Sequence, residues 1–341
     1  MMSAPSPLVS VVIPTHNRRD MLERVLDSLA RQTLPPDSYE VIVVDDGSTD
    51  GTPEVANLAF PYRLRYVRQD NRGPAAARNN GANHAYGNML LFLDDDIVAS
   101  PDLVKEHIVT QLRYPSGVIV IGETKTVLPP AAGPFGRLAV SSNSPDGATL
   151  ARYTNGEGRL PGTFCLSGNM SVQMEVFRLL GMFAEDLLGT ASGWSRWEDV
   201  ELGWRAEKSG IPIAYAPRAV GYHHDYAAAN LQVSCRRMTA VSMTAPWLFK
   251  RHPDIQSRLP MFYDKHPINL GSDDLALIIR KLLRMMASSR PVVWGMEQVV
   301  RRLEAHFPKP WLLRPLYRWI IGAYIFRGYR QGLRRLRATT R

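Results

Sequence analysis

Short runs of β-branched and aliphatic residues alternate with helical patterns over the first hundred positions of the chain. Four runs have the continuous apolar character of strands buried in a parallel sheet: residues 8–13, 40–45, 64–68 and 88–94. Between them, residues 18–31 gather their apolar side chains on one helical face, and residues 74–86 are rich in Ala. Capping residues predict two further helices, beginning near Pro53 and Pro101. This alternation predicts a doubly wound, mostly parallel α/β sheet whose ligand site lies at the carboxyl ends of the strands.

The pattern becomes irregular after residue 115. Residues 129–162 hold many turn-forming residues and few periodic apolar positions, which predicts a long mobile loop. Helices are expected near residues 172–180 and 198–209, and the run IAYAPRAVGY, residues 213–222, is expected to be a strand.

The C-terminal residues carry a different pattern and most of the charge. After Ser272, breaks at prolines delimit amphipathic helices at about 273–287, 291–306 and 311–338. The 341-residue chain has a formal charge of +9, but residues 275–341 hold 15 Lys and Arg against two Glu, a charge of +13. The other 274 residues therefore sum to −4. We divide the chain into residues 1–115, residues 116–272 and a basic helical module of residues 273–341.

Composition excludes several classes of protein. With 45% hydrophobic and 21% charged residues, the chain is neither disordered, nor collagen-like, nor a coiled-coil rod. No apolar run approaches the ~18 residues of a membrane span, and no basic segment precedes an apolar stretch at the start. Two cysteines are too few for a disulfide framework. We therefore expect a cytoplasmic protein.

Polar clusters follow the predicted strands. PTHNR follows the first strand, DDGS follows the second, and Asp94, Asp95 and Asp96 end the fourth. Three adjacent carboxylates repel one another, and their pKa values rise unless a cation neutralises them. An isolated Asp run could simply cap a helix, but this one is in register with the other strand-end clusters. Because Mg²⁺ or Mn²⁺ on one or two carboxylates completes its shell with water and phosphate oxygens, the pattern favours a metal-bound diphosphate.

Four ordered segments resemble the donor-binding half of glycosyltransferase family 2: VSVVIPTHNR, VIVVDDGSTDGT, NRGPAAARNNG and LFLDDD. Further along, FCLSGNMSV resembles the stretch beneath the donor sugar, and WEDVELGWRAEKSG resembles the family's Glu-Asp acceptor motif. The resemblance covers about residues 8–225. It implies the Rossmann-like GT-A fold, with residues 1–115 as the donor half and residues 116–272 as the acceptor and catalytic half. It also implies inverting transfer from a nucleotide-diphosphate sugar, with UDP the expected nucleotide and dTDP or GDP as alternatives, and a Mn²⁺ or Mg²⁺ cofactor.

The resemblance implies a donor site at the strand ends. Its residues are Pro14, Thr15, His16, Asn17, Arg18, Asp46, Arg78, Asp94 and Asp95. Pro14 and His16 would lie beside the base and ribose, Asp46 would accept from the base N–H, and Arg78 would face the base and diphosphate. Family members often carry an aromatic residue at the position of His16, so stacking and an ordinary loop role both stay open.

The implied metal ligands are Asp96, Asp94 and His223. Asp96 is expected to contact the ion directly, and Asp94 to contact the ribose or the ion. His223 and His224 are adjacent, and neighbouring side chains of an extended chain point in opposite directions, so at most one of them should serve. His223 is the closer match to the family histidine, and a structural role is its alternative.

Asp199 is the expected general base. Inverting transfer is a single in-line displacement, and one carboxylate within reach of the acceptor hydroxyl suffices. Glu198 would orient that base or bind an acceptor hydroxyl; alternatively, both acids merely stabilise the first turn of a helix. The remaining acceptor candidates are Gly168, Asn169, Trp194 and Trp197, whereas Trp204 is expected in the core.

The apolar faces of the basic module could be covered in three ways. Its apolar stripes, with Trp311, Leu313, Trp319 and Ile320, suit a peripheral site on an anionic membrane surface. A packed helical subdomain or a homodimer face are the alternatives. No recognised nucleic-acid motif accompanies the charge, so nucleic acid is not an expected partner.

The sequence therefore predicts a metal-dependent inverting glycosyltransferase acting on a sugar, lipid-linked or other hydroxyl acceptor. Two rivals remain. One is a catalytically silent nucleotide- or sugar-binding partner of a membrane glycan-assembly complex. The other, a sugar-1-phosphate nucleotidyltransferase, usually opens with a Gly-rich loop containing Arg and Lys, which PTHNRRD lacks.

Overall fold

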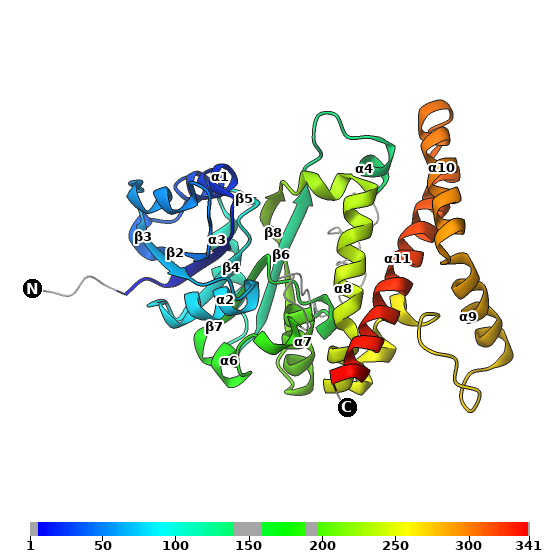
Figure 1. The fold of residues 1–341 in the computed structure, drawn as a ribbon. Coiled ribbons are helices and arrows are strands. Elements are labelled where there is room, and N and C mark those ends of the chain that lie inside the picture. Colours follow the sequence, from blue (N-terminus) through cyan, green and yellow to red (C-terminus); the bar gives the residue numbers. More distant parts are fainter. Residues whose placement is uncertain (1–5, 140–158, 189–196, 340–341) are drawn as a thin grey trace, which may run out of the picture. The chain divides into compact units, whose positions relative to one another are not determined.

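The computed structural model describes residues 6–139, 159–188 and 197–339, which form two compact units (Figure 1). The described residues within 1–127, 144–186 and 198–225 make the first unit. Those within 128–143, 187–197 and 226–341 make the second. The boundaries expected near residues 115 and 272 stay predictions. Among the described residues, no helix is long and apolar enough to cross a membrane.

The first unit is built on one mixed sheet. Its strands are β1 Val9–Thr15, β2 Tyr39–Asp46, β3 Arg63–Gln69, β4 Met89–Leu93, β5 Ile97–Ala99, β6 Ile119–Thr126, β7 Asn169–Gln173 and β8 Ile213–His223. They lie in the order β3-β2-β1-β4-β7-β6-β8-β5. The neighbours β3, β2, β1 and β4 are parallel, as are β6 and β8, whereas β7 runs antiparallel to both its neighbours and β5 antiparallel to β8. The predicted doubly wound, mostly parallel α/β architecture is confirmed.

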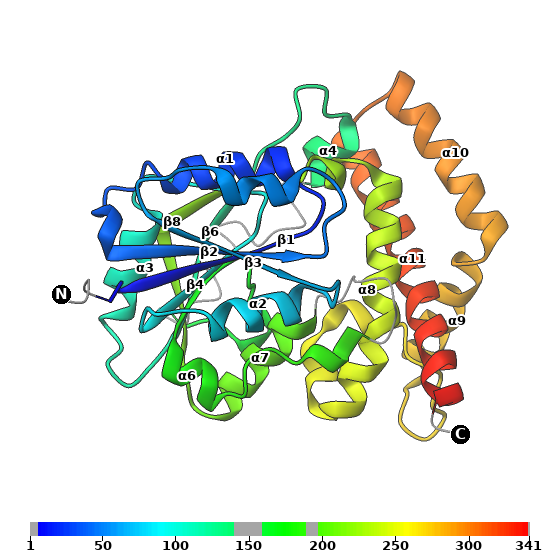
Figure 2. The ribbon, with the colours of Figure 1, turned by 60° about the vertical axis from the view of Figure 1, so that its left-hand side comes forward.

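Helices cover both faces of this sheet (Figure 2). They are α1 Arg19–Leu29, α2 Pro74–Asn83, α3 Leu103–Gln111, α6 Met174–Leu179 and α7 Trp197–Lys208. Alternate side chains of β1 pack on opposite faces of the sheet. Val11 and Ile13 pack with α1 and α3, and Val12 packs in a cluster that includes residues of α2, α6 and α7.

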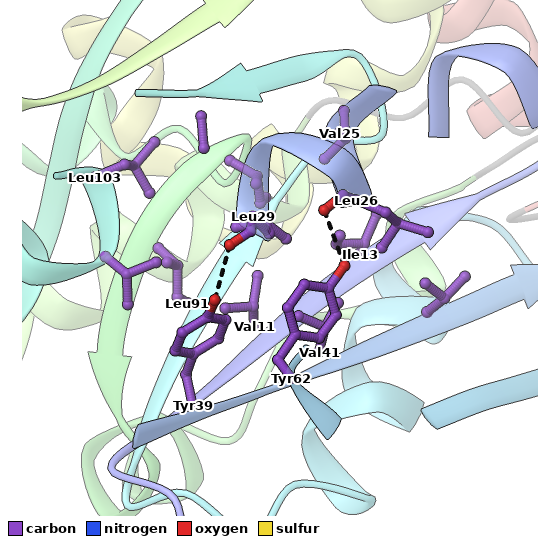
Figure 3. Packing of buried hydrophobic residues seen from close by; sticks show 14 of the residues in the cluster. Val11, Ile13, Val25, Leu26, Leu29, Tyr39, Val41, Tyr62, Leu91 and Leu103 are labelled. Atoms are coloured by element: carbon purple, nitrogen blue, oxygen red, sulfur yellow. Dashed lines mark hydrogen bonds between the residues drawn. The ribbon is translucent and has the colours of Figure 1, made fainter. Parts of the chain in front are cut away.

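The core between α1, α3 and the sheet also contains two tyrosines, Tyr39 and Tyr62 (Figure 3). The hydroxyl of Tyr39 donates to the carbonyl of Leu29 at 2.7 Å, and that of Tyr62 donates to the carbonyl of Leu26 at 2.9 Å. Both acceptors lie in α1, so the phenol groups fix this helix against the sheet while their hydroxyls stay paired.

The sequence pattern located the four N-terminal strands and the helices beside them, but some expectations were wrong. The helix expected near Pro53 is a short 3₁₀ segment, Thr52–Asn57. The helix expected near residues 172–180 is present as α6, Met174–Leu179, although residues 172 and 173 belong to strand β7. The described residues of the segment 115–225 include the strands β6, β7 and β8, so this part is less irregular than its Gly and Pro content suggested. Of the expected loop at 129–162, residues 140–158 lie outside the described part, and Pro134–Ala139 is helix α4.

The second unit is helical. It contains α4, α8 Leu231–Arg251, α9 Leu275–Ala287, α10 Arg290–His306 and α11 Pro310–Thr339. Two glycines let α11 lie close to α8: a Cβ at Gly328 would meet the carbonyl oxygen of Thr239 at 2.3 Å, and one at Gly332 would meet that of Met243 at 2.0 Å. Leu313 and Ile320 of α11 are fully buried in the core of this unit. The apolar stripe that suggested a membrane contact is therefore mostly internal.

Candidate functional site

The polar residues singled out at the strand ends meet at one edge of the first unit's sheet. Parallel pairing puts the carboxyl ends of β1, β2 and β4 side by side. The reversed strand β7 begins at the same edge, and β8 ends there. Two contacts join the strands across it: the Thr15 hydroxyl donates to Asp95 at 2.8 Å, and His223 Nε2 lies 3.2 Å from Asp96.

Arg18 neutralises two of the three adjacent carboxylates. Its Nη1 lies 2.6 Å from Asp96 Oδ2 and 3.1 Å from Asp95 Oδ1. Burial raises the pKa of Asp95 to about 7, although the charge of Arg18 opposes this shift. Burial also acts to raise the pKa of Asp96, but the hydrogen bond from His223 and the charge of Arg18 outweigh it and hold that pKa well below its usual range. The same contact with Asp96 outweighs burial at His223 and raises the pKa of the imidazole.

Arg78 neutralises the third carboxylate and ties it to α7. It is buried, with Nη2 2.7 Å from Asp94 Oδ1 and Nη1 3.3 Å from Glu198 Oε1. Burial and the neighbouring charge of Asp199 raise the pKa of Glu198 to about 7 against the pull of Arg78. Arg78 Nε and Glu198 Oε2 are buried and have no hydrogen-bond partner among the described residues. Such atoms are costly to leave unpaired, so this part of the site is incomplete without a ligand or water.

Asp46 shapes the loop that follows β3. Its carboxylate accepts from Gln69 Nε2 at 2.7 Å and from the backbone N–H groups of Arg72 and Gly73, both at 2.8 Å. The predicted acceptor of a base N–H is thus already bonded on both oxygens to its own chain. Its backbone carbonyl also accepts from His16 Nδ1 at 2.9 Å.

Asn17 fixes the turn between β1 and α1. It has a left-handed backbone, with φ of 54°, which Asn tolerates better than most residues. Its side-chain oxygen accepts from the backbone N–H of Thr49 at 2.7 Å and of Asp50 at 3.3 Å, and its amide nitrogen lies 3.1 Å from Nε2 of exposed His16. Pro14, the remaining donor candidate, is half-buried in β1.

A buried polar network fixes the first residue of β7. Asn169 is 2% exposed; its oxygen accepts from His107 Nε2 at 2.9 Å, and its amide donates to the carbonyls of Glu123 and Ala219. On the other side of the ring, His107 Nδ1 accepts from the hydroxyl of Ser171. Burial lowers the pKa of His107 to about 4, so the imidazole stays neutral. The Asn169 side chain is thus buried and bonded to its own chain, so its predicted contact with the acceptor stays a prediction.

The segment before β7 links the donor carboxylates to the expected base. The carbonyl of Gly168 accepts from the backbone N–H of Asp94 at 3.0 Å, and a Cβ at Gly168 would lie 2.7 Å from Asp94 Oδ2. The neighbouring backbone N–H of Ser167 donates to Asp199 Oδ2 at 3.4 Å. Asp199 itself lies in the first turn of α7 and is half-buried.

The two tryptophan candidates differ. Trp197 is buried in the second unit, where its indole N–H donates to the carbonyl of Val241 at 2.8 Å and its ring packs against Phe262. Trp194 lies outside the described residues. Trp204 is buried, as expected for a core residue.

The donor set suits a divalent ion only if the ligand completes its shell. Among the described residues, no group of three or more His, Cys, Asp or Glu side chains is placed to hold a metal by itself. Asp96 and His223 are nonetheless adjacent, and Arg18 holds the second oxygen of Asp96. The Asp96 carboxylate, completed by phosphate oxygens and water, fits Mn²⁺ or Mg²⁺.

Sequence reasoning found the acids of this site but not their partners. Each of the two arginines was assigned to the donor, yet Arg18 pairs with Asp95 and Asp96, and Arg78 joins Asp94 to Glu198. An arginine directly after a strand and another in the next helix were the available signals. The ion pair between Arg78 and Glu198 joins residues 120 positions apart, and no local sequence pattern indicates such a contact.

Comparison with known proteins agrees with this strand-end arrangement. Residues 10–129 match the family model for glycosyl transferase family 2. We therefore identify residues 10–129 as a segment of the glycosyl transferase family 2 type. This matched segment holds β1 to β4 and the three strand-end aspartates, so the predicted family is confirmed on the residues that suggested it.

Two curated relatives extend the similarity beyond that segment. Validoxylamine A glucosyltransferase of Streptomyces hygroscopicus subsp. limoneus is 30% identical over 280 residues, which cover 74% of this chain and 58% of that protein. The homologous enzyme of Streptomyces hygroscopicus subsp. jinggangensis is also 30% identical, and the match covers 63% of it. The chain thus spans about three fifths of the length of these curated relatives.

Structural comparison confirms the fold. The mannosyltransferase PcManGT of Pyrobaculum calidifontis, in complex with GDP-Man and Mn²⁺, superposes with a TM-score of 0.59 at 21% identity, covering 95% of this chain and 87% of that one. The likeness supports the predicted GT-A fold.

Proposed function

We propose that this chain transfers a sugar from a nucleotide-diphosphate sugar to an acceptor hydroxyl with inversion at the anomeric carbon. The observation that carries the proposal is the cluster of Asp94, Asp95 and Asp96 at the carboxyl edge of the sheet, joined through Arg78 to the start of α7. Residues 167 and 168 bond to Asp199 and Asp94 respectively, so a donor carboxylate and the expected base share one support.

The donor half supplies charge for a diphosphate. Arg18 and Arg78 hold the carboxylates in place, and their guanidinium charges favour a diphosphate at this edge of the sheet. A Mn²⁺ or Mg²⁺ ion held by Asp96, with Asp94 or His223, would stabilise the nucleoside diphosphate as it leaves. UDP remains our preferred nucleotide.

The acceptor half supplies the base. The acceptor oxygen forms the new bond to the anomeric carbon while the bond to the diphosphate breaks and its electron pair leaves with the phosphate. Asp199 takes the hydroxyl proton. Glu198, which is paired with Arg78, orients the general base Asp199. The acceptor is a sugar, lipid-linked or other hydroxyl compound, and we place the reaction in the cytoplasm, at a peripheral membrane surface.

The test is nucleoside diphosphate release from a panel of UDP-, dTDP- and GDP-sugars with Mn²⁺, for wild type and Asp199→Asn. Removing a general base typically costs about 10²–10⁴ in rate, so the variant should bind donor normally and lose turnover by that factor. Near-normal turnover would show that Asp199 is not the base. Donor binding without turnover, even in wild type supplied with candidate acceptors, would instead favour the catalytically silent partner.

A further inference from the structure

Helix α9 is attached to the second unit by its charged side chains. Its one buried residue is Lys281, whose Nζ donates to Asp273 at 2.6 Å and to the carbonyl of Pro267 at 3.1 Å. One turn on, Arg284 Nε donates to Asp264 at 2.9 Å. Its guanidinium also lies over Gly322 of α11, where a Cβ would meet Nη1 at 2.8 Å. The polar face of α9 therefore points inward.

The apolar face of α9 is left on the outside. Leu275, Ile279, Leu282, Leu283 and Met286 recur at the i, i+4, i+7, i+8 and i+11 spacing of a single helical face. Their exposed fractions run from 40% to 73%. Figures 1 and 2 place α9 at the periphery of the second unit, with α11 and α10 as its neighbours. An amphipathic helix normally buries this face, so the arrangement is inverted and calls for an external partner.

The exposed charges of α9, α10 and the segment before α11 indicate the nature of that partner. Arg280 on α9, Arg290 and Arg301 on α10, and Lys309 before α11 are all exposed. The two glutamates of residues 275–341 are half-buried, and each accepts from a tyrosine hydroxyl of α11: Glu297 from Tyr324 at 2.8 Å, and Glu304 from Tyr317. The exposed Asp274, which caps α9 next to Leu275, is the acidic exception. The exposed charged side chains within α9 and α10 are otherwise positive.

We infer that the outer face of α9 docks on an anionic lipid bilayer. The helix lies in the plane of the interface, with its five apolar side chains among the acyl chains and the neighbouring Arg and Lys side chains on the lipid phosphates. A second copy of this chain would bring an equal segment of +13 against the first, whereas a bilayer rich in acidic lipid matches both the apolar face and the charge. This docking rests on the proposed function only for the peripheral location that it explains. It does not require glycosyl transfer, so the two proposals can fail separately.

The experiment is co-sedimentation of the full chain with vesicles of equal parts phosphatidylglycerol and phosphatidylcholine. The test variant carries Ile279→Asn and Leu283→Asn, both on the exposed face, so the fold should be kept. The matched control is Leu179→Asn, which replaces a 76% exposed leucine of α6 in the first unit. We expect wild type and control to bind alike, the α9 variant to bind about tenfold more weakly, and added salt to weaken the binding of wild type.

A site-specific probe tests insertion directly. Both native cysteines are buried, so an environment-sensitive fluorophore can be attached at Leu282→Cys. Its emission should shift to the blue with the acidic vesicles and stay unchanged with pure phosphatidylcholine. Equal binding of wild type and the α9 variant, equal binding to neutral vesicles, or no spectral shift would overturn the inference. A dimer in sedimentation velocity that the α9 variant dissociates, without vesicle binding, would overturn it in favour of a second copy.

Discussion

Removal of Arg78 should destabilise the first unit more than removal of Arg18, the other arginine of the site. Its side chain is 6% exposed and that of Glu198 is 5% exposed, so the pair has little solvent to replace a missing partner. Arg78→Gln leaves Glu198 buried beside Asp199 and frees Asp94. Breaking a buried ion pair from one side typically costs about 3–5 kcal/mol, and we expect a loss of unfolding free energy in that range.

Arg18 provides the matched comparison, because it neutralises carboxylates of the same cluster. Its side chain is 36% exposed. In Arg18→Gln, Asp96 still interacts with His223, and Asp95 still accepts a hydrogen bond from the Thr15 hydroxyl. We therefore expect a loss of only about 1–2 kcal/mol.

The assay is urea-induced unfolding followed by circular dichroism, with hydrogen exchange of peptides from β1, β4 and β7 assigning the transition to the first unit. The double variant Arg78→Gln, Glu198→Gln should recover part of the loss, because no uncompensated charge then remains at residue 198. Equal losses for the two arginine variants, or no recovery in the double variant, would refute the description of Arg78 as the buried clamp of this site.

Two further predictions concern buried and close-packed groups near β7. The pKa of His107 is about 4 in the folded state and 6.5 ordinarily, so the unfolded chain takes up a proton first as pH falls; stability is full above 6.5 and should fall by about 2 kcal/mol at about pH 5. Urea unfolding above pH 6.5 and at about pH 5 should show this loss of unfolding free energy in wild type but not in His107→Gln. The same pH dependence in both proteins would contradict a buried, neutral His107 ring. Gly168→Ala should displace the flexible carboxylate of Asp94, weakening donor binding in calorimetry with little loss of stability; unaltered affinity would show that this close approach is unimportant.

The strands and their polar ends were predictable because they depend on local pattern. A buried parallel strand such as β4 is continuously apolar, and the Asp residues that end it can only lie at the edge of the sheet. The family motifs could be found in the sequence because each of them is a run of neighbouring residues.

Features that depend on tertiary contacts were not predictable in this way. The partners of Arg78 come from residues 94 and 198, and the role of Asp46 depends on backbone N–H groups of residues 72 and 73. The sequence showed that α9 is amphipathic, but not that Lys281 and Arg284 would face inward. Helix α8 was not anticipated at all, since its Ser and Thr residues and Pro246 obscure the apolar period.

Thermal unfolding of the chain with nucleotide sugars, in the presence and absence of Mn²⁺, tests the central claim most directly. A ligand that binds only the folded state raises its apparent stability. We expect one nucleotide sugar to raise the melting temperature of wild type, more strongly with Mn²⁺, and the effect of Mn²⁺ to disappear in Asp96→Asn when each protein is compared with its own ligand-free baseline. Failure of every nucleotide sugar to stabilise wild type, or an equal effect of Mn²⁺ in Asp96→Asn, would contradict a metal-assisted donor site at the carboxyl edge of this sheet.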